Sequence, residues 1–333
     1  MAPSADSANV VPDGQASIAG SSSHGSSSIV LPSRSGNGSL NGTSPLKSTG
    51  NTNAPRIDIP KFELPPETPG KCVAERRWTP SLFDLSGKTA LVTGANGGIG
   101  GGMARGLAEA GADIIIFQIP GDQSTFGEKL AQETNCKVSI YDCDMGNSAM
   151  IRETVRKVTD DGHGIDILCN VAGISSGSIP ILYETDEHKD AIIQINFNSV
   201  WVLSQVVAKH MVERGRGGKI INICSLAAHK AMTTFSVYGP MKAAVGQLTN
   251  AFANEFGPYN VQVNAIYPGW IDTALAQRFI NDEEANKKIL SSIPSRRWGK
   301  PDDFKGITVF LASSASDYVN GARIFLDGGA HSM

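Results

Sequence analysis

From about residue 85 to the C-terminus, short runs of β-branched and other apolar residues alternate with longer stretches in which apolar residues recur every three or four positions. Short apolar runs are typical of strands buried in a parallel sheet, and the longer period is typical of helices packed against one. Ile99, Met103, Leu107 and Ala110, for example, form one helical stripe. Seven runs predict strands: Thr89–Val92, Ile114–Phe117, Val138–Tyr141, Ile165–Leu168, Lys219–Ile223, Val261–Ile266 and Arg323–Leu326.

Seven strands separated by helices predict an α/β fold, a single doubly wound parallel sheet with helices on both faces. We assign it to residues 82–333, because composition does not change again before the C-terminus. Residues 1–53 are rich in Ser, Gly, Asn and Pro and almost free of large apolar residues, which predicts a disordered tail. Residues 54–81 carry six prolines and are interpreted as an extended connector.

Charge and composition exclude several classes of partner. The 333 residues have a formal net charge of -3, and no apolar run in the sequence reaches membrane-spanning length, so we expect neither nucleic acid nor membrane binding. The five cysteines and six histidines lack the spacing of metal ligands, which predicts reduced thiols and no metal site. Because the N-terminal stretch has no apolar signal core, a cytoplasmic location is the expectation.

Six glycines occupy the nine positions from Gly94 to Gly102, between the first strand and the first helix. A turn of this kind lets a pyrophosphate approach bare backbone and the free N–H groups of a helix N-terminus. The spacing of Gly94, Gly98 and Gly100 differs from the GxGxxG fingerprint, so the motif alone also fits a glycine loop without a ligand.

The stretch from Thr93 to Gly100 resembles the cofactor loop of the short-chain dehydrogenase/reductase family. Further segments resemble this family in the same order along the chain: Asp144 after the third strand, Asn170-Val171-Ala172-Gly173, Asn196 in a helix, Ser225 thirteen residues before Tyr238, the Tyr238-x-x-x-Lys242 pair, and Pro268-Gly269-x-Ile271-x-Thr273. The resemblance spans Leu85 to the C-terminus and implies an NAD(P)-dependent enzyme that interconverts a ketone and a secondary alcohol.

Tyr238 and Lys242 are four residues apart and share one face of a helix. We expect Lys242, together with the oxidised nicotinamide, to lower the pKa of the phenol from about 10 to about 7, so that Tyr238 acts as general acid or base. Ser225 would donate a hydrogen bond to the substrate oxygen. The resemblance implies that Asn196 holds a water linking Lys242 to solvent. Taken singly, Ser225 also fits a strand end and Asn196 a helix break.

The resemblance also implies a set of cofactor contacts: Thr93, Gly94, Asn96, Gly98, Ile99, Gly100, Gln118, Asp144, Asn170, Ala172, Gly173, Tyr238, Lys242, Pro268, Gly269, Ile271 and Thr273. Asp144 fits a strand-end cap equally well. Val171 replaces the family's second asparagine, which removes a polar anchor near the cofactor. Because proline is tolerated only in the first turn, Pro240 predicts that its helix begins close to Val237.

The end of the second strand bears on the choice of dinucleotide. Gln118 stands where an acid would bind the ribose hydroxyls, and no Lys or Arg follows until Lys129 to attract a 2′-phosphate. A modest preference for NAD(H) over NADP(H) follows. Asp122 would strengthen it if its turn folds back toward the ribose, although a solvated turn residue is the simpler interpretation.

The stretch from Ile293 to Gly321 is similar to the branch of 2-dehydro-3-deoxygluconate and 2-deoxygluconate dehydrogenases, which implies a sugar-acid-like substrate and a homodimer or homotetramer. Alternatives are a ketoacyl thioester or a polycyclic ketone as substrate. Two further alternatives are not active enzymes: a catalytically silent dinucleotide sensor and a scaffold protein recruited through the Ser-rich tail. Residues 270–293 are the expected substrate lid, with Trp270, Leu275 and Phe279 as pocket walls or as ordinary helix-core residues.

Overall fold

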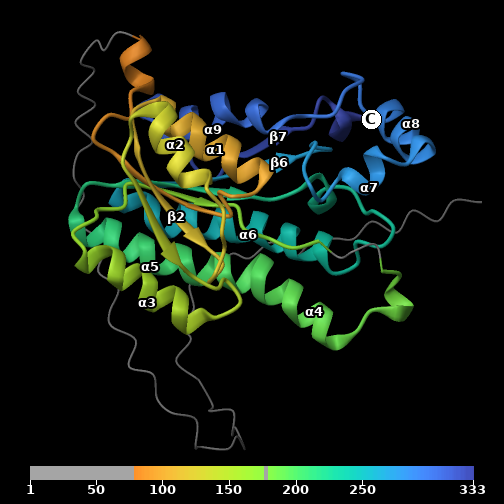
Figure 1. The fold of residues 1–333 in the computed structure, drawn as a ribbon, viewed down its shortest axis with the longest axis horizontal. Helices are drawn as coiled ribbons and strands as arrows, with labels where there is room; N and C mark the ends of the chain where they lie inside the picture. The colour runs from red at the N-terminus through yellow and green to blue at the C-terminus, as the bar shows by residue number, and fades with distance from the viewer. Residues whose placement is uncertain (1–78, 176–178) are drawn as a thin grey trace, which may run out of the picture. The chain divides into compact units, whose positions relative to one another are not determined.

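The computed structural model describes residues 79–175 and 179–333, so the predictions for residues 1–53 and for most of residues 54–81 lie outside the described part. Seven parallel strands form one sheet in the order β3-β2-β1-β4-β5-β6-β7 (Figure 1). This confirms the predicted doubly wound sheet. The strands are β1 (Thr89–Thr93), β2 (Asp113–Gln118), β3 (Val138–Asp142), β4 (Ile167–Asn170), β5 (Gly218–Ile223), β6 (Val261–Pro268) and β7 (Arg323–Leu326).

Only β7 has the predicted bounds at both ends; β1, β2, β3 and β5 differ by no more than one residue at either end, and β4 and β6 differ by two. β4 begins at Ile167, because its first ladder partner on β1 is Ala90; Ile165 is buried but precedes the ladder. β6 continues to Pro268, which pairs with Leu326 at the end of β7. A proline is tolerated at the end of a strand, where its missing N–H interrupts no further pairing.

Helices cover both faces of the sheet (Figure 1). Ala90 and Val92 of β1 pack in one cluster with Met103 of α1, whereas Leu91 between them packs in a second cluster with Leu203 of α5 on the opposite face. Alternate side chains of one strand thus enter two cores. The helices of the described part are α1 (Gly98–Glu109), α2 (Phe126–Thr134), α3 (Ser148–Asp160), α4 (Asp186–Ile193), α5 (Ser199–Arg214), α6 (Tyr238–Phe256), α7 (Gln277–Ile280), α8 (Glu283–Ser291) and α9 (Phe304–Ala312).

α4, a π-helical segment (Gln194–Asn198) and α5 form one helix of 29 residues. Its mean hydropathy of 1.3 makes it long and apolar enough to cross a membrane, which corrects the expectation that no run reaches this length. Half of its most apolar window is buried inside the domain, where Leu203 and Val207 pack against the sheet. Asn196 and Ser204 are buried polar residues of the same helix. We therefore interpret it as a core helix of the domain.

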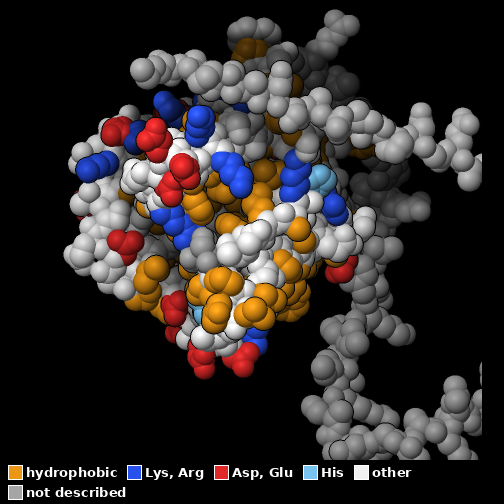
Figure 2. All heavy atoms as spheres, turned by 90° about the vertical axis from the view of Figure 1, so that its right-hand side faces the viewer, with side chains coloured by type: hydrophobic (Ala, Val, Ile, Leu, Met, Phe, Trp, Pro, Cys, Tyr) orange, Lys and Arg blue, Asp and Glu red, His pale blue; other side chains and the backbone are white. Residues whose placement is uncertain are grey.

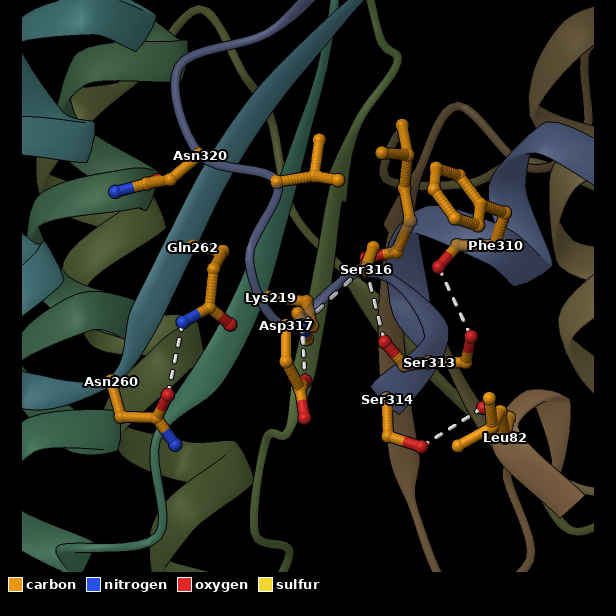
Figure 3. Close-up of polar contacts among 12 residues, drawn as sticks. Leu82, Lys219, Asn260, Gln262, Phe310, Ser313, Ser314, Ser316, Asp317 and Asn320 are labelled. Carbon is orange, nitrogen blue, oxygen red and sulfur yellow. Dashed lines mark hydrogen bonds and ion pairs between the residues drawn. The ribbon is translucent and has the colours of Figure 1, made fainter. Parts of the chain in front are cut away.

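A polar cluster lies at the amino ends of β5 and β6 (Figure 3). Lys219 of β5 is buried, and its ammonium lies 2.8 Å from the Asp317 carboxylate. Burial lowers the pKa of Lys219, and Asp317 opposes this shift. The Ser316 hydroxyl lies within hydrogen-bond distance of the Leu311 carbonyl of α9 and the Ser313 carbonyl, and Asn320 accepts a hydrogen bond from the Val263 N–H at 2.9 Å. These bonds fix the segment between α9 and β7, and with it the position of β7 beside β6.

Candidate active site

At the carboxyl edge of the sheet, the loops that follow β1, β2, β4, β5 and β6 enclose a cavity of about 590 Å³. This is the edge at which a doubly wound sheet binds its ligands. The wall of this cavity contains sixteen of the catalytic and cofactor residues that were assigned from the sequence: Gly94, Asn96, Gly98, Ile99, Gly100, Gln118, Asp144, Ala172, Gly173, Ser225, Tyr238, Lys242, Pro268, Gly269, Ile271 and Thr273.

Thr93 and Asn170 lie beneath the cavity rather than in its wall. The Thr93 hydroxyl accepts hydrogen bonds of 3.0 Å from the N–H groups of Val171 and Ala172. The Asn170 amide donates to the Ser204 hydroxyl at 2.9 Å. Both side chains are buried, so the structure gives them the role of holding the loop after β4 in place. Val171, where the family has an asparagine, keeps its backbone anchor through Thr93.

The glycine-rich loop owes its composition to two different requirements. Gly94 has φ +66°, and a Cβ on Gly100 would lie 2.2 Å from the Gly94 carbonyl oxygen, so the turn and the first helical turn pack backbone against backbone. The first N–H groups of α1 point out of this turn without intrahelical acceptors. Gly102 serves packing instead, because a Cβ there would lie 2.1 Å from the Pro301 carbonyl oxygen. The sequence did not separate these two uses.

α6 begins at Tyr238, with Val237 as its N-cap, which confirms the helix start predicted from Pro240. Tyr238 and Lys242 therefore lie on consecutive turns of one helix face, and the Lys242 ammonium is 5.8 Å from the centre of the tyrosine ring. The ammonium donates a hydrogen bond of 2.9 Å to the Ile223 carbonyl. Ser225 follows directly after β5, and its hydroxyl oxygen accepts the Ala227 N–H at 3.0 Å. The hydroxyl hydrogen of Ser225 remains to donate.

Burial dominates the titration of both groups. It raises the pKa of Tyr238 to about 12, and a hydrogen bond with Ser225 opposes the rise. It also lowers the pKa of Lys242 to about 8, because a buried ammonium loses hydration. The chain's own residues therefore do not lower the pKa of the phenol toward 7. That shift stays a prediction for the protein with oxidised dinucleotide bound.

Asn196 is fully buried in the π-helical segment, and it does not line the cavity. Its amide exchanges two hydrogen bonds with the backbone of Ile174, donating to the carbonyl at 2.8 Å and accepting from the N–H at 3.0 Å. A Cβ on Gly173 would lie 2.6 Å from the Asn196 oxygen and 3.5 Å from the Lys242 nitrogen. The missing side chain at Gly173 thus keeps open the space between Asn196 and Lys242.

Asp122, interpreted from the sequence as a solvated turn residue, lines the cavity. The turn after β2 folds back, and the Asp122 carboxylate accepts a hydrogen bond of 2.8 Å from the Asn96 amide. The same amide lies 3.4 Å from the Gln118 side-chain oxygen. The sequence showed an acid four residues after Gln118 but not the direction of the turn. Asp144 lines the cavity and caps its own turn by accepting the Gly146 N–H at 2.7 Å, while its contact with the cofactor stays a prediction.

The segment after β6 forms another part of the cavity wall. Trp270, Leu275 and Phe279 all line the cavity, and Trp270 and Phe279 also pack edge to face at 5.6 Å. Arg278 lines it as well, although the sequence gave no sign of which way it faces. The side of the molecule that carries α7 and α8 faces the viewer in Figure 2, where exposed hydrophobic side chains gather beside Lys and Arg.

Residues 94–331 match a family model described as Enoyl-(Acyl carrier protein) reductase. This match covers most of the chain and includes the glycine loop, Ser225 and the Tyr238–Lys242 pair. The chain belongs to the short-chain dehydrogenase/reductase family. Among the described residues of this short-chain dehydrogenase/reductase, no group of three or more His, Cys, Asp and Glu side chains is arranged to hold a metal ion.

Named relatives and a solved structure extend the comparison. The chain is 43% identical over 250 residues to a 2-dehydro-3-deoxy-D-gluconate 5-dehydrogenase of Pseudoalteromonas atlantica, covering 74% of this chain and 97% of the relative. It is 36% identical over 250 residues to a gluconate 5-dehydrogenase of Gluconobacter oxydans, covering 75% and 97%. A gluconate 5-dehydrogenase from Burkholderia cenocepacia, solved with NADP and tartrate, superposes with a TM-score of 0.74 at 35% identity, covering 77% of this chain and all of that one.

The cavity of this short-chain dehydrogenase/reductase fits a nicotinamide dinucleotide. The bare backbone of Gly94 and the N-terminus of α1 form a cradle suited to a pyrophosphate. A Cβ on Gly98 would lie 2.6 Å from the Thr273 side chain, so the loop after β6 lies close over the same cradle. Gln118 and Asp122 lie at the end suited to the adenosine ribose, and Tyr238 lies in the wall of the same cavity.

Proposed function

We propose that this protein is an NAD(P)-dependent oxidoreductase that interconverts a ketone and a secondary alcohol of a sugar-acid-like substrate. The observation that carries the proposal is the convergence of Ser225, Tyr238 and Lys242 on a cavity that also contains the glycine cradle. The relatives named as gluconate and deoxygluconate dehydrogenases support the substrate class. The bound dinucleotide would supply or accept the hydride.

The chain's own residues handle the proton. In the direction of reduction, the Tyr238 hydroxyl donates its proton to the substrate oxygen, and the Ser225 hydroxyl donates a hydrogen bond to the same atom. The phenolate formed is stabilised by the Lys242 ammonium, which the Ile223 carbonyl holds on its side of the site. In oxidation the same groups act in reverse, and Tyr238 accepts the proton of the alcohol.

Activity measured by absorbance at 340 nm tests this function. The panel contains 5-keto-D-gluconate and 2-dehydro-3-deoxy-D-gluconate, a ketoacyl thioester and a polycyclic ketone, each with NADH and with NADPH. Turnover of the sugar acids supports the proposal. Turnover of only the thioester or only the polycyclic ketone would show that the proposed substrate class is wrong and that the proposed reaction, the interconversion of a ketone and an alcohol, is right. Dinucleotide binding without turnover of any compound would favour the dinucleotide sensor. The retention of Ser225, Tyr238 and Lys242 argues against that alternative.

We propose NAD(H) as the preferred dinucleotide, by about three- to thirtyfold in kcat/KM. The Asp122 carboxylate, held by Asn96, supports this preference because it would repel a 2′-phosphate and bond ribose hydroxyls. The Burkholderia cenocepacia relative was solved with NADP, whereas the preference proposed for this chain rests on its own Asp122. It depends on the turn after β2 rather than on the strand end.

Asp122→Asn tests this assignment, with Asp142→Asn as matched control. Asp142 also bonds Gln118, at 3.1 Å, but does not line the cavity. Titration of NAD⁺ and NADP⁺ should show that Asp122→Asn narrows the ratio of the two dissociation constants by about fivefold or more, while Asp142→Asn leaves it unchanged. An unchanged ratio in the Asp122 variant, or tighter binding of NADP⁺ by the native protein, would remove Asp122 from this role.

We also propose that the chain forms a homodimer or homotetramer and works in the cytosol. Half of the most apolar window of the helix from Asp186 to Arg214 is not buried within the domain, and Trp201 on it is 37% exposed, which suits a subunit interface. The four described cysteines are unpaired, which suits a reducing compartment. Sedimentation that shows only monomer at micromolar concentration would contradict the assembly.

A further inference from the structure

Charged side chains are distributed unevenly around the cavity. Its two acids, Asp122 and Asp144, lie on the loops after β2 and β3. Among the described residues that line it, the basic ones are Lys242 and Arg278. Lys242 is buried and committed to the Ile223 carbonyl beside Tyr238. Arg278 on α7 is therefore the one cavity cation that the mechanism above does not use.

Arg278 has no carboxylate partner within the described part of the protein, where three other arginines form ion pairs. Its guanidinium lies over the ring of Phe279, with 4.6 Å between the guanidinium carbon and the ring centre. Stacking on an aromatic ring holds the planar group while its N–H donors stay free. A positioned guanidinium with free donors is suited to bind an anion in two-point fashion.

The packing of Phe279 indicates which part of the ligand Arg278 faces. Phe279 belongs to a cluster with Leu226 and Met232. Leu226 follows Ser225 directly, and Met232 lies on the loop that leads to Tyr238. The cradle for the pyrophosphate is instead approached by Thr273, five residues before Arg278. Arg278 therefore extends from the substrate end of the cavity and not from its phosphate end.

We propose that Arg278 is the specificity-determining residue that binds the carboxylate of a hydroxy or keto acid in this site. The inference rests on the proposed function for the reaction itself, and it adds how an acid is distinguished from a neutral ketone. The surrounding wall of Leu226, Met232, Trp270 and Phe279 offers no other charge to an anion. Arg278 is itself exposed to solvent, so an arriving carboxylate can reach its guanidinium without displacing a protein partner.

The test compares Arg278→Gln with Lys287→Gln, a control that removes one positive charge from α8, outside the cavity lining. Two ketones serve as substrates: 5-keto-D-gluconate and L-sorbose, which has a hydroxymethyl group in place of the carboxylate. We expect Arg278→Gln to raise KM for the acid by about tenfold or more, with kcat within about threefold and kcat/KM for L-sorbose unchanged. Arg278→Lys should have a KM for the acid between those of the native protein and Arg278→Gln, and Lys287→Gln should leave this KM unchanged.

Equilibrium binding separates this inference from the proposed reaction. Trp270 lies beside Phe279, so its fluorescence should report 5-keto-D-gluconate titrated into the protein with NAD⁺, a pair that cannot react. Binding that is lost in Arg278→Gln supports the carboxylate site even if the acid is never reduced. Absence of binding to the native protein, equal losses for acid and L-sorbose, or a raised dissociation constant for NAD⁺ in Arg278→Gln would each overturn it, the last by assigning Arg278 to the pyrophosphate.

Discussion

Tyr238 lines the cavity and is partly exposed to solvent. Its hydroxyl reaches the same cavity as Ser225, while burial holds its pKa at about 12 in the protein alone. A phenol at that pKa stays protonated at neutral pH, so it can donate a proton to the substrate oxygen but cannot accept one. At the residue scale, the pH range in which Tyr238 can act as the base of alcohol oxidation is therefore set by what lowers this pKa when the dinucleotide is bound.

We predict that Tyr238→Phe lowers kcat by about a hundredfold or more, because the proton donor to the substrate oxygen is lost. Dinucleotide affinity should stay within about threefold, since the ring and its contact with Phe235 are kept. Steady-state kinetics and a dinucleotide titration measure the two effects. Near-normal turnover in this variant would refute the assigned mechanism.

The pH dependence of the two directions should differ in sign. Alcohol oxidation needs the phenolate, so its kcat/KM should rise by about tenfold per pH unit up to the pKa of Tyr238 in the dinucleotide complex and then level off. Ketone reduction needs the phenol and should fall above that same pKa. Rates measured from pH 6 to 10 in both directions test this. A flat profile for oxidation over that range would contradict Tyr238 as the base.

At the scale of elements, the first helix and the segment that begins at Pro301 are fitted to each other through glycine. A Cβ on Gly102 would lie 2.1 Å from the Pro301 carbonyl oxygen, and one on Gly106 would lie 2.9 Å from the Lys305 Cα. α1 and α9 can approach this closely only because both side chains are absent. The N-terminus of α1, which forms part of the cradle, is held in place by this contact.

We predict that Gly102→Ala lowers the free energy of unfolding by about 1–3 kcal/mol, because backbone must move to accept the methyl group. Gly306→Ala on α9 is the matched control: a Cβ there meets nothing within 4 Å. A helical glycine in open space should gain about 0.4–1 kcal/mol on replacement by alanine. Urea unfolding of both variants measures the difference. Equal stabilities would show that the α1 contact is not tight in solution.

At the scale of the whole molecule, residues 79–175 and 179–333 contain a hydrophobic core on each face of the sheet. Two apolar clusters lie on the two faces of the sheet, and the polar cluster around Lys219 joins its amino edge to the segment before β7. None of these contacts requires residues 1–53. The Ser- and Gly-rich composition of that stretch provides too little apolar surface to offset its ordering entropy.

We therefore predict that deletion of residues 1–53 changes Tm by less than about 2 °C and leaves dinucleotide affinity and kcat/KM within about twofold. Thermal unfolding and kinetics of the truncated chain beside the full chain measure this. A fall in Tm of more than about 5 °C, or a loss of activity, would show that the tail packs on the domain.

Some features were determined by the sequence because they depend on residues close together along the chain. The periods of apolar residues predicted the seven strands, and the first-turn requirement of Pro240 predicted the start of α6 at Tyr238. The four-residue spacing of Tyr238 and Lys242 placed them on one face. Local backbone geometry fixes each of these, so tertiary packing changed only strand bounds by a few residues.

Other features were decided by the tertiary structure, because they join residues far apart in the chain. The partner of Gly102 is Pro301, and the Asn96 amide meets Asp122 only because the turn after β2 folds back. Thr93 and Asn170, assigned to the cofactor from the sequence, lie under the cavity, where strands β1 and β4 are neighbours. Tertiary packing likewise decided that the Arg278 side chain faces the cavity. A sequence states which side chains are available, and the packing of elements determines which of them face one cavity.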